Sequence, residues 1–292
     1  MQKIKLWFGV CRPYSLFVSA SPVLAGLLVL GYVPNILVAV ATLMCAMSLQ
    51  VFSNLVNDYY DFVRGCDKAG RSGPQRPLAE GIVNINQMRN ACIVALSVSL
   101  LLGAYLIWIG GWVILIVGVL AVIFAWLYTA TRFSLAYLGV ADIVCFLFYG
   151  PVASAGTVYL QTATLPLEAV WVGCACGCIA VCVLASNNIR DIEEDRSVGK
   201  RTFPVRFGKT AALVGVATIL LASVAFAVLG FRSWLMLVLL VPNVFLFIRL
   251  VRAQGKSYNK CLFSFVILDA FVVVLAVVAF VIEKYACSCL II

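Results

Sequence analysis

The sequence contains no histidine, and only 11% of its 292 residues are charged. The absence of histidine excludes imidazole acid–base chemistry and histidine metal ligands. The low charged fraction, together with 64% hydrophobic residues and a mean hydropathy of +1.09, excludes an ordinary soluble domain. The chain is therefore predicted to be an all-α, polytopic membrane protein that lies in a lipid bilayer.

The hydrophobic residues form nine segments, each close to the ~20 residues needed to cross the core of a bilayer. Short breaks separate several of them, which predicts antiparallel neighbours. We expect two sets of four helices and one appended helix around a central cavity. They would form a single domain over 1–292, with repeat-like halves at about 1–130 and 131–255. The predicted spans are about 13–31, 35–57, 87–108, 111–129, 135–158, 166–190, 209–229, 234–251 and 261–282.

Positive charge is distributed unevenly between the loops that these spans create. With the N-terminus inside, all of the 21 Lys and Arg residues except Arg232 and Lys284 lie at inner helix ends or in inner loops. Because inner loops of membrane proteins collect positive charge, the N-terminus and the two long polar loops are predicted to be cytoplasmic. This charge bias also accounts for the net charge of +9, so no nucleic-acid partner is expected.

The twelve cysteines do not indicate a metal or redox site. Cys174, Cys176, Cys178 and Cys182 lie within one apolar segment, whereas a thiolate cage needs polar surroundings. Buried cysteine behaves as a small hydrophobic residue. We therefore interpret nearly all of the cysteines as packing residues.

Four polar side chains share one helical face at the end of the second span. Asn54, Asn57, Asp58 and Asp61 are spaced at i, i+3, i+4 and i+7. Such a stripe is unfavourable beside lipid unless a cation or water compensates it. Amide and carboxylate oxygens suit Mg²⁺, which binds a few carboxylates together with substrate phosphates. The stripe therefore predicts a Mg²⁺–diphosphate site at a membrane surface.

A second polar loop, 189–208, follows the sixth predicted span. Asn187 and Asp191 repeat the four-residue spacing of Asn57 and Asp61, so two facing sets of helices would bring both acidic ends over one cavity. An allylic diphosphate leaves once bridging metal ions and basic side chains neutralise its charge. The two loops supply the basic residues Arg64, Lys68, Arg71, Arg76, Arg190, Arg196, Lys200, Arg201 and Arg206.

At these residues the chain resembles the UbiA superfamily of membrane prenyltransferases, and within it the 1,4-dihydroxy-2-naphthoate polyprenyltransferase family. The resemblance extends over nearly the whole chain. Asp142 departs from it, because glutamate is expected there. The motifs that carry the resemblance are Arg12-Pro13, Ser21-Pro22-Val23, Asn57-Asp58-Tyr59, Asp61, Asp67, Gly73-Pro74, Arg76, Tyr128-Thr129, Phe146 to Val152, Asn187-Asn188, Arg190-Asp191, Asp195 and Gly199-Lys200.

The resemblance implies Mg²⁺-dependent transfer of a polyprenyl group from polyprenyl diphosphate to 1,4-dihydroxy-2-naphthoate, with decarboxylation, to give demethylmenaquinone. It also implies an integral protein of the bacterial cytoplasmic membrane. It assigns metal binding to Asn57, Asp61, Asp67, Asn188, Asp191 and Asp195, and diphosphate binding to Arg12, Lys68, Arg71, Arg190, Lys200 and Arg201. The implied catalytic residues are Asp61, Asp67, Asp191, Asp195 and Asp142, and the implied substrate pocket contains Tyr128, Tyr149 and Asp142.

Two alternatives stay open from the sequence. The first is another aromatic acceptor, such as 4-hydroxybenzoate. The second is a membrane transporter in which Asp142 and Asp269 couple ion movement to transport. Transporter sites lie near the bilayer midplane, whereas the acidic residues here concentrate at one membrane face. Mg²⁺-dependent release of diphosphate from a polyprenyl diphosphate distinguishes the enzyme from the transporter.

Overall fold

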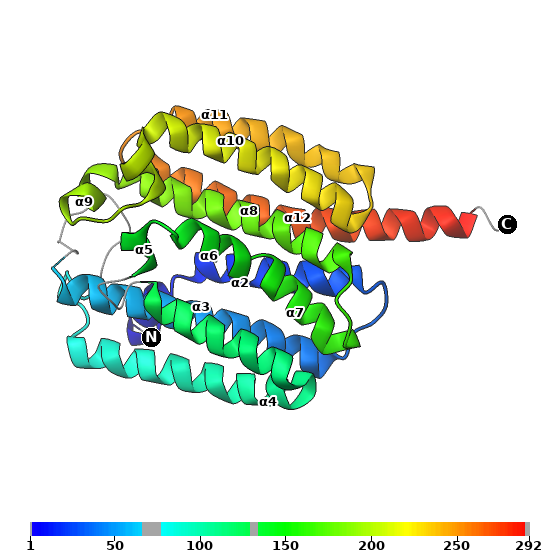
Figure 1. The fold of residues 1–292 in the computed structure, drawn as a ribbon, viewed down its shortest axis with the longest axis horizontal. Coiled ribbons are helices and arrows are strands. Elements are labelled where there is room, and N and C mark those ends of the chain that lie inside the picture. The colour runs from blue at the N-terminus through cyan, green and yellow to red at the C-terminus, as the bar shows by residue number, and fades with distance from the viewer. Residues whose placement is uncertain (1, 66–76, 129–133, 290–292) are drawn as a thin grey trace.

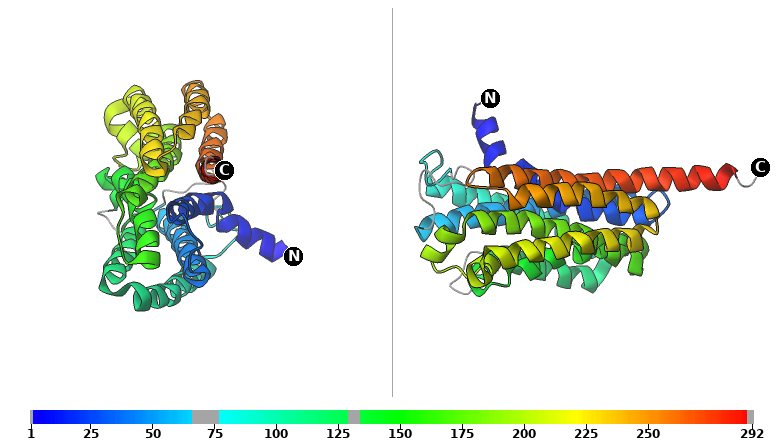
Figure 2. Two further views of the ribbon diagram at one scale, coloured as in Figure 1. Left: turned by 90° about the vertical axis from the view of Figure 1, so that its right-hand side faces the viewer. Right: turned by 90° about the horizontal axis from the view of Figure 1, so that it is seen from above.

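The described residues of the computed structural model, 2–65, 77–128 and 134–289, form helices and contain no strand. Most helices run side by side along one axis, with α9 at one end of the bundle and the end of α12 projecting beyond the other (Figure 1). Figure 2 shows α1 leaving the bundle sideways. The elements are α1 (Gln2–Val10), α2 (Pro13–Val29), α3 (Ile36–Val63), α4 (Ile85–Leu127), α5 (Leu135–Leu138), α6 (Ala141–Phe148), α7 (Pro151–Thr162), α8 (Leu167–Arg190), α9 (Ile192–Ser197), α10 (Phe203–Phe231), the 3-10 helix η1 (Trp234–Leu239), α11 (Leu240–Val251) and α12 (Ser257–Cys289).

The structure confirms the all-α class and the membrane-spanning character of the chain. Among the described residues, seven helical segments are long and apolar enough to cross a membrane, and α2 is apolar but shorter. The count of nine spans requires α2 and both halves of α4 to cross the bilayer, so it stays a prediction. The repeat-like halves stay a prediction as well.

The break predicted between the third and fourth spans lies within α4. Gly111 has φ 63° and ψ −150°, a conformation that glycine adopts readily and other residues avoid. The chain doubles back within α4 in Figure 1. At Gly110, a Cβ would lie only 2.2 Å from the Ile114 side chain, so the two legs approach closely because glycine occupies this position.

The segment predicted as one span at 135–158 is divided among α5, α6 and α7. Gly139 ends α5 at φ 77°. Between α6 and α7, Gly150 packs against α8, where a Cβ would lie 2.8 Å from the backbone oxygen of Gly173. This close approach holds Tyr149, the last residue before the break, against the centre of the bundle.

α8 is the central helix of the bundle and contacts α2, α6, α7, α10 and α12. Cys174, Cys176, Cys178 and Cys182 are buried in it and form no disulfide, which confirms their interpretation as packing residues. Outside the membrane-spanning helices, burial raises the pKa of the Cys11 thiol, so this cysteine also stays a neutral thiol.

Candidate active site

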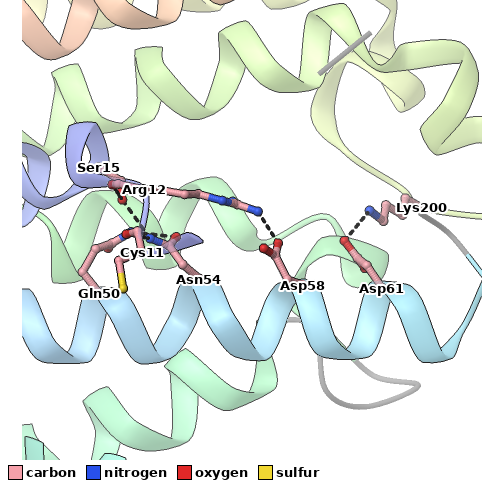
Figure 3. A network of polar contacts seen from close by, with 8 residues as sticks. All are labelled: Cys11, Arg12, Ser15, Gln50, Asn54, Asp58, Asp61 and Lys200. Carbon is pink, nitrogen blue, oxygen red and sulfur yellow. Dashed lines mark hydrogen bonds and ion pairs between the residues drawn. The ribbon is translucent and has the colours of Figure 1, made fainter. Parts of the chain in front are cut away.

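The two predicted acidic motifs face each other at one end of the bundle. Asp61 lies in the last turn of α3, Asp195 lies in α9, and both are more than 90% buried. The ammonium Nζ of Lys200 lies 3.8 Å from Asp61 Oδ2 and 3.7 Å from Asp195 Oδ1. One cation therefore lies between carboxylates that are 134 residues apart in the sequence (195 − 61), and Figure 3 shows Lys200 extending toward Asp61.

The end of α9 explains the position of Lys200. Gly199 has φ 78°, and its N–H donates to Arg196 O while the N–H of Lys200 donates to Asp195 O. This pair of bonds is a Schellman motif, which requires a left-handed residue at the position of Gly199. The motif turns the chain back, so Lys200 returns beside Asp195.

A second ion pair joins the start of α2 to α3. The guanidinium of Arg12 donates to Asp58 Oδ1, and Asp58 is 2% exposed (Figure 3). Arg12 has φ 52° and ψ 67°, a left-handed conformation that is uncommon outside glycine. The backbone turn between α1 and α2 thus directs the Arg12 side chain toward the acidic end of α3.

Arg190 is committed to contacts within the protein. Its side chain is 4% exposed, and its Nε and Nη2 donate to the two carboxylate oxygens of Asp191 at 2.6 and 2.7 Å. Its Nη1 donates to Asn259 in the first turn of α12. Arg190 therefore links the end of α8 to α12. Its guanidinium also holds the Asp191 carboxylate in a fixed position.

A cavity of about 370 Å³ extends from this acidic end into the bundle. Its polar end is lined by Arg12, Asn57 and Asn187. Asn57 lies one helical turn before Asp61 on α3, and Asn187 lies one turn before Asp191 at the end of α8. Its apolar end is lined by Leu106, Ile114 and Leu160, which belong to one buried cluster. Both Tyr128 and Tyr149 line it, as the resemblance implies.

Other residues that the resemblance assigns to the site do not line this cavity or lie outside the described residues. Asn188 and Asp142 do not line the cavity, whereas Asn187 does. Asp142 is in the first turn of α6 and its Oδ1 is buried without a hydrogen-bond partner. Arg201 is exposed. The residues Asp67, Lys68 and Arg71 lie outside the described residues.

Two polar residues of the site were not predicted from the sequence. Gln50 lines the cavity and lies one turn before Asn54, so it extends the polar stripe of α3 into the membrane-spanning part. Extending the i, i+4 pattern backwards would have found it. Asn259, by contrast, is 69 residues from Arg190 and carries no local signal.

The residues at the acidic end fit a hard divalent cation. Asn57 Oδ1 is buried without a hydrogen-bond partner and lies one helical turn before Asp61 on α3, and carboxylates from α3 and α9 meet at Lys200. Among the described residues, no three Asp, Glu, Cys or His side chains form a metal cluster. This composition suits Mg²⁺, which takes one or two carboxylates and completes its shell with substrate phosphates and water.

Comparison with known proteins agrees with this geometry. A model of the UbiA prenyltransferase family matches residues 19–282. The chain is 33% identical to a 1,4-dihydroxy-2-naphthoate octaprenyltransferase of Escherichia coli (strain K12), over 76% of this chain and 75% of the relative. It is also 33% identical to the protein of the same name from Haemophilus influenzae, over 80% of each chain.

Among solved structures, a UbiA homolog from Archaeoglobus fulgidus bound to GPP and Mg²⁺ has the same fold. It superposes with a TM-score of 0.67 at 21% identity, covering 93% of this chain and 98% of that one. A second structure, described as a digeranylgeranylglyceryl phosphate synthase, superposes with a TM-score of 0.65 at 16% identity over 96% of this chain and 99% of the other. The chain belongs to the UbiA prenyltransferase family.

Proposed function

We propose that this protein transfers a polyprenyl group from a polyprenyl diphosphate to 1,4-dihydroxy-2-naphthoate, with loss of carbon dioxide and in the presence of Mg²⁺, to give demethylmenaquinone. One observation carries the proposal: acidic side chains from two distant segments flank Lys200 at the mouth of a cavity whose far end is apolar. The relatives named as 1,4-dihydroxy-2-naphthoate octaprenyltransferases support the choice of acceptor.

The acidic end is suited to bind the diphosphate. Asp61, Asp195 and Asn57 would hold the metal, with Asp191 beside them and Asp67 from the first loop. Bound Mg²⁺ would neutralise the negative charge that develops on the diphosphate as it leaves. Lys200 and Arg12 are placed to add charge-assisted hydrogen bonds to the same group.

We infer that Arg190 does not bind the diphosphate. Both nitrogens that form a bidentate fork already bind Asp191, and breaking a buried ion pair is strongly destabilising. We infer that its role is to hold Asp191 in place. A contact with the substrate would require these bonds to break.

The cavity is suited to bind the tail and to protect a reactive cation. The prenyl chain would extend toward the apolar end formed by Leu106, Ile114 and Leu160. An allylic cation must be shielded from water, and aromatic faces stabilise it by cation–π attraction. Tyr128 and Tyr149 line the cavity and are candidates for this role.

The acceptor ring needs little help from a base. A hydroquinone ring is electron-rich enough to attack an allylic cation without prior deprotonation. This suits a chain without histidine, in which water or a carboxylate takes the remaining proton. The same reasoning favours dihydroxynaphthoate over 4-hydroxybenzoate, whose single phenol donates less electron density.

We further propose that the protein lies in the bacterial cytoplasmic membrane with its N-terminus and acidic end facing the cytoplasm. This orientation places the site where a water-soluble, charged acceptor and Mg²⁺ are both present. It rests on the charge bias of the loops.

The test is product analysis by mass spectrometry. Membranes containing the protein receive geranylgeranyl diphosphate, Mg²⁺, and both 1,4-dihydroxy-2-naphthoate and 4-hydroxybenzoate in competition. The expected main product is prenylated naphthoquinol without its carboxylate, and chelation with EDTA abolishes it. A dominant prenylated 4-hydroxybenzoate would reject the acceptor assignment, and the absence of diphosphate release with either acid would favour a transporter.

Variants of two acidic residues on α9 test the site itself. Asp195→Asn removes a buried carboxylate that faces Lys200, whereas Glu193→Gln changes a side chain that is 84% exposed and pairs with Arg196. Turnover should fall by at least about a hundredfold in Asp195→Asn and in Asp61→Asn, because a lost charge-stabilising group costs roughly 3 kcal/mol in the transition state. Glu193→Gln should keep nearly full activity.

A further inference from the structure

A directional chain of hydrogen bonds runs along the wall of the cavity, starting at the turn between α1 and α2. The hydroxyl of Ser15 donates to Arg12 O at 2.9 Å. Since a serine hydroxyl has only one hydrogen, Ser15 Oγ can only accept from its other neighbour. That neighbour is Asn54, whose Nδ2 lies 2.8 Å from Ser15 Oγ and 3.4 Å from Cys11 O (Figure 3).

These two acceptors fix which way the Asn54 amide faces. Its Nδ2 must point to Ser15 and to the Cys11 carbonyl, so its Oδ1 points toward Gln50. Gln50 Nε2 donates to Asn54 Oδ1 at 3.1 Å. The Gln50 amide is thereby oriented as well, with its carbonyl Oε1 on the side of Tyr149, which lies two residues before the start of α7.

The Tyr149 hydroxyl donates to Gln50 Oε1. A carbonyl oxygen can only accept, so the one hydrogen of the phenol is used in this bond. Tyr149, Gln50 and Asn54 all line the cavity. Tyr149 Oη therefore presents a hydrogen-bond acceptor, and no donor, to whatever lies beside it.

Building on the proposed function, we propose that Tyr149 Oη accepts a hydrogen bond from a ring hydroxyl of the aromatic acceptor, and that Gln50 and Asn54 are positioning residues that keep Tyr149 in this state. The class of ligand follows from the direction of the hydrogen bonds that end at Tyr149. A reduced, hydroxyl-bearing ring donates to Tyr149, whereas a quinone oxygen, an aryl ether or a carboxylate has no hydrogen to donate and meets the oxygen unfavourably. Tyr149 thus selects the reduced form of the acceptor.

The position of Tyr149 agrees with this role. Gln50 precedes Asn57 by seven residues on α3, which corresponds to roughly 10 Å along a helix. A diphosphate bound at Asn57 and Asp61 would place its allylic carbon between the acidic end and Gln50. The reacting ring must lie beside that carbon. A hydrogen bond accepted by Tyr149 also increases the electron density of the ring, which helps it to attack the allylic cation.

The test compares 1,4-dihydroxy-2-naphthoate with its two monomethyl ethers, using purified protein, Mg²⁺ and geranylgeranyl diphosphate. The variants are Tyr149→Phe and Gln50→Leu. Tyr159→Phe is the matched control, because Tyr159 is on α7, packs against the buried cluster at the apolar end, and is not among the residues that line the cavity. Each protein gives a KM for the acceptor, a KM for the prenyl donor and the ratio of kcat/KM for the free diol to that for each ether.

In the wild type, one ether should react about tenfold less efficiently than the diol, which is the usual size of one lost hydrogen bond together with an unmatched acceptor. Tyr149→Phe should remove this preference and raise the acceptor KM, with the donor KM unchanged. Gln50→Leu releases the Tyr149 hydrogen, so Tyr149 can then donate to the ether, and the ether should react more efficiently than in the wild type. The control should behave as the wild type.

Three outcomes would overturn the inference. The first is an unchanged diol-to-ether ratio in Tyr149→Phe. The second is a ratio in Gln50→Leu equal to that of the wild type, which rejects the positioning role. The third is a parallel increase of both KM values, which indicates general damage to the cavity. If the wild type prenylates none of the compounds, the proposed function fails instead, and the two failures are distinguishable.

Discussion

Lys200 shows how a single side chain prepares the site for a metal. Its ammonium lies within 4 Å of carboxylates from both acidic motifs and is only 15% exposed. Two partly desolvated carboxylates that face each other repel unless a cation separates them. Lys200 supplies that cation in the protein itself, and these carboxylates would hold Mg²⁺ while Lys200 would contribute charge to the diphosphate.

The Lys200→Gln variant tests this interpretation. Without divalent cations the two buried carboxylates then lose an ammonium that lies within 4 Å of both, so unfolding should become easier by on the order of 1 kcal/mol. Saturating Mg²⁺ should restore most of this stability, because the metal neutralises the same carboxylates. Thermal unfolding in detergent, measured with EDTA and with MgCl₂, gives both values.

The control for Lys200→Gln is Lys260→Gln, which removes an exposed positive charge at the start of α12. It should lower the unfolding temperature little under either condition. Equal destabilisation of Lys200→Gln with and without Mg²⁺ would contradict the metal-linked role. Turnover of Lys200→Gln should fall in either case, because a cation near the leaving diphosphate is lost.

Residue types and spacing predicted which charged residues the structure brings together at one end of the bundle, while their roles stay a prediction. Asp61, Asp191, Asp195 and Lys200 were all identified, because acidic and basic residues are rare in this chain and occur at helix ends. The contacts that determine their roles could not be predicted. The commitment of Arg190 to Asp191 and Asn259 depends on the packing of α12 against α8, which no local pattern encodes.

At the scale of helices, small residues set the distance between α8 and its neighbours. Gly173 and Gly177 face the break between α6 and α7, and a Cβ on Gly177 would lie 2.5 Å from Phe146 O. Backbone atoms cannot move aside as side chains do. The glycines therefore hold the break, and Tyr149 with it, close to the cavity.

Gly177→Ala should destabilise this contact by about 1–3 kcal/mol, the usual cost of overpacking, and should raise the KM for the acceptor by displacing Tyr149. Gly215→Ala is the matched control, since a Cβ there meets nothing within 4 Å and alanine favours a helix. Thermal unfolding and acceptor kinetics of both variants provide the comparison. If Gly177→Ala and Gly215→Ala unfold at the same temperature, α8 can move away from α6 without loss of stability, and the contact does not set their distance.

α12 contacts the active site through the hydrogen bond between Asn259 and Arg190, and Asn259→Ala removes it. Loss of a hydrogen bond to the buried Arg190 should lower stability by about 1–3 kcal/mol and reduce turnover, because Asp191 loses the support of a fixed guanidinium. Asn259→Asp, which keeps an acceptor oxygen for Arg190, should retain more activity. Ser264→Ala, which removes an exposed contact between α12 and Arg249, should change neither quantity. Equal turnover in Asn259→Ala and the wild type would exclude this support.

For the whole molecule, hydropathy predicted the positions of most helices but not how the chain is divided between them. The pair Gly110-Gly111 correctly marked a reversal, because a left-handed glycine interrupts any helix. The division of 135–158 into three helices was missed, since the span is mostly apolar and its breaks depend on close packing against α8 and Arg201. α1 was also not predicted, because it is short and lies before the first apolar segment.

The orientation of the bundle in the membrane is a prediction that involves every loop. Arg232 and Lys284 are the only basic residues assigned to the outer side, so the charge bias places the α7–α8 turn outside and the α11–α12 turn inside. Thr164 and Lys256 are exposed in these two turns. Thr164→Cys should therefore gain labelling by a membrane-impermeant thiol reagent in intact cells, above the background of the wild type.

Lys256→Cys should gain labelling only after the membrane is made permeable, which also serves as the control that its thiol is reactive. Each added cysteine lies in a turn at the end of a helix, so neither should disturb the packing of the bundle. The opposite pattern would reverse the orientation and place the acidic end outside. Labelling of both variants in intact cells would mean that the two turns lie on one side, which is incompatible with the number of crossings between them. Mg²⁺ and the acceptor can reach the acidic end from the cytoplasm only if Thr164→Cys is labelled in intact cells and Lys256→Cys is not.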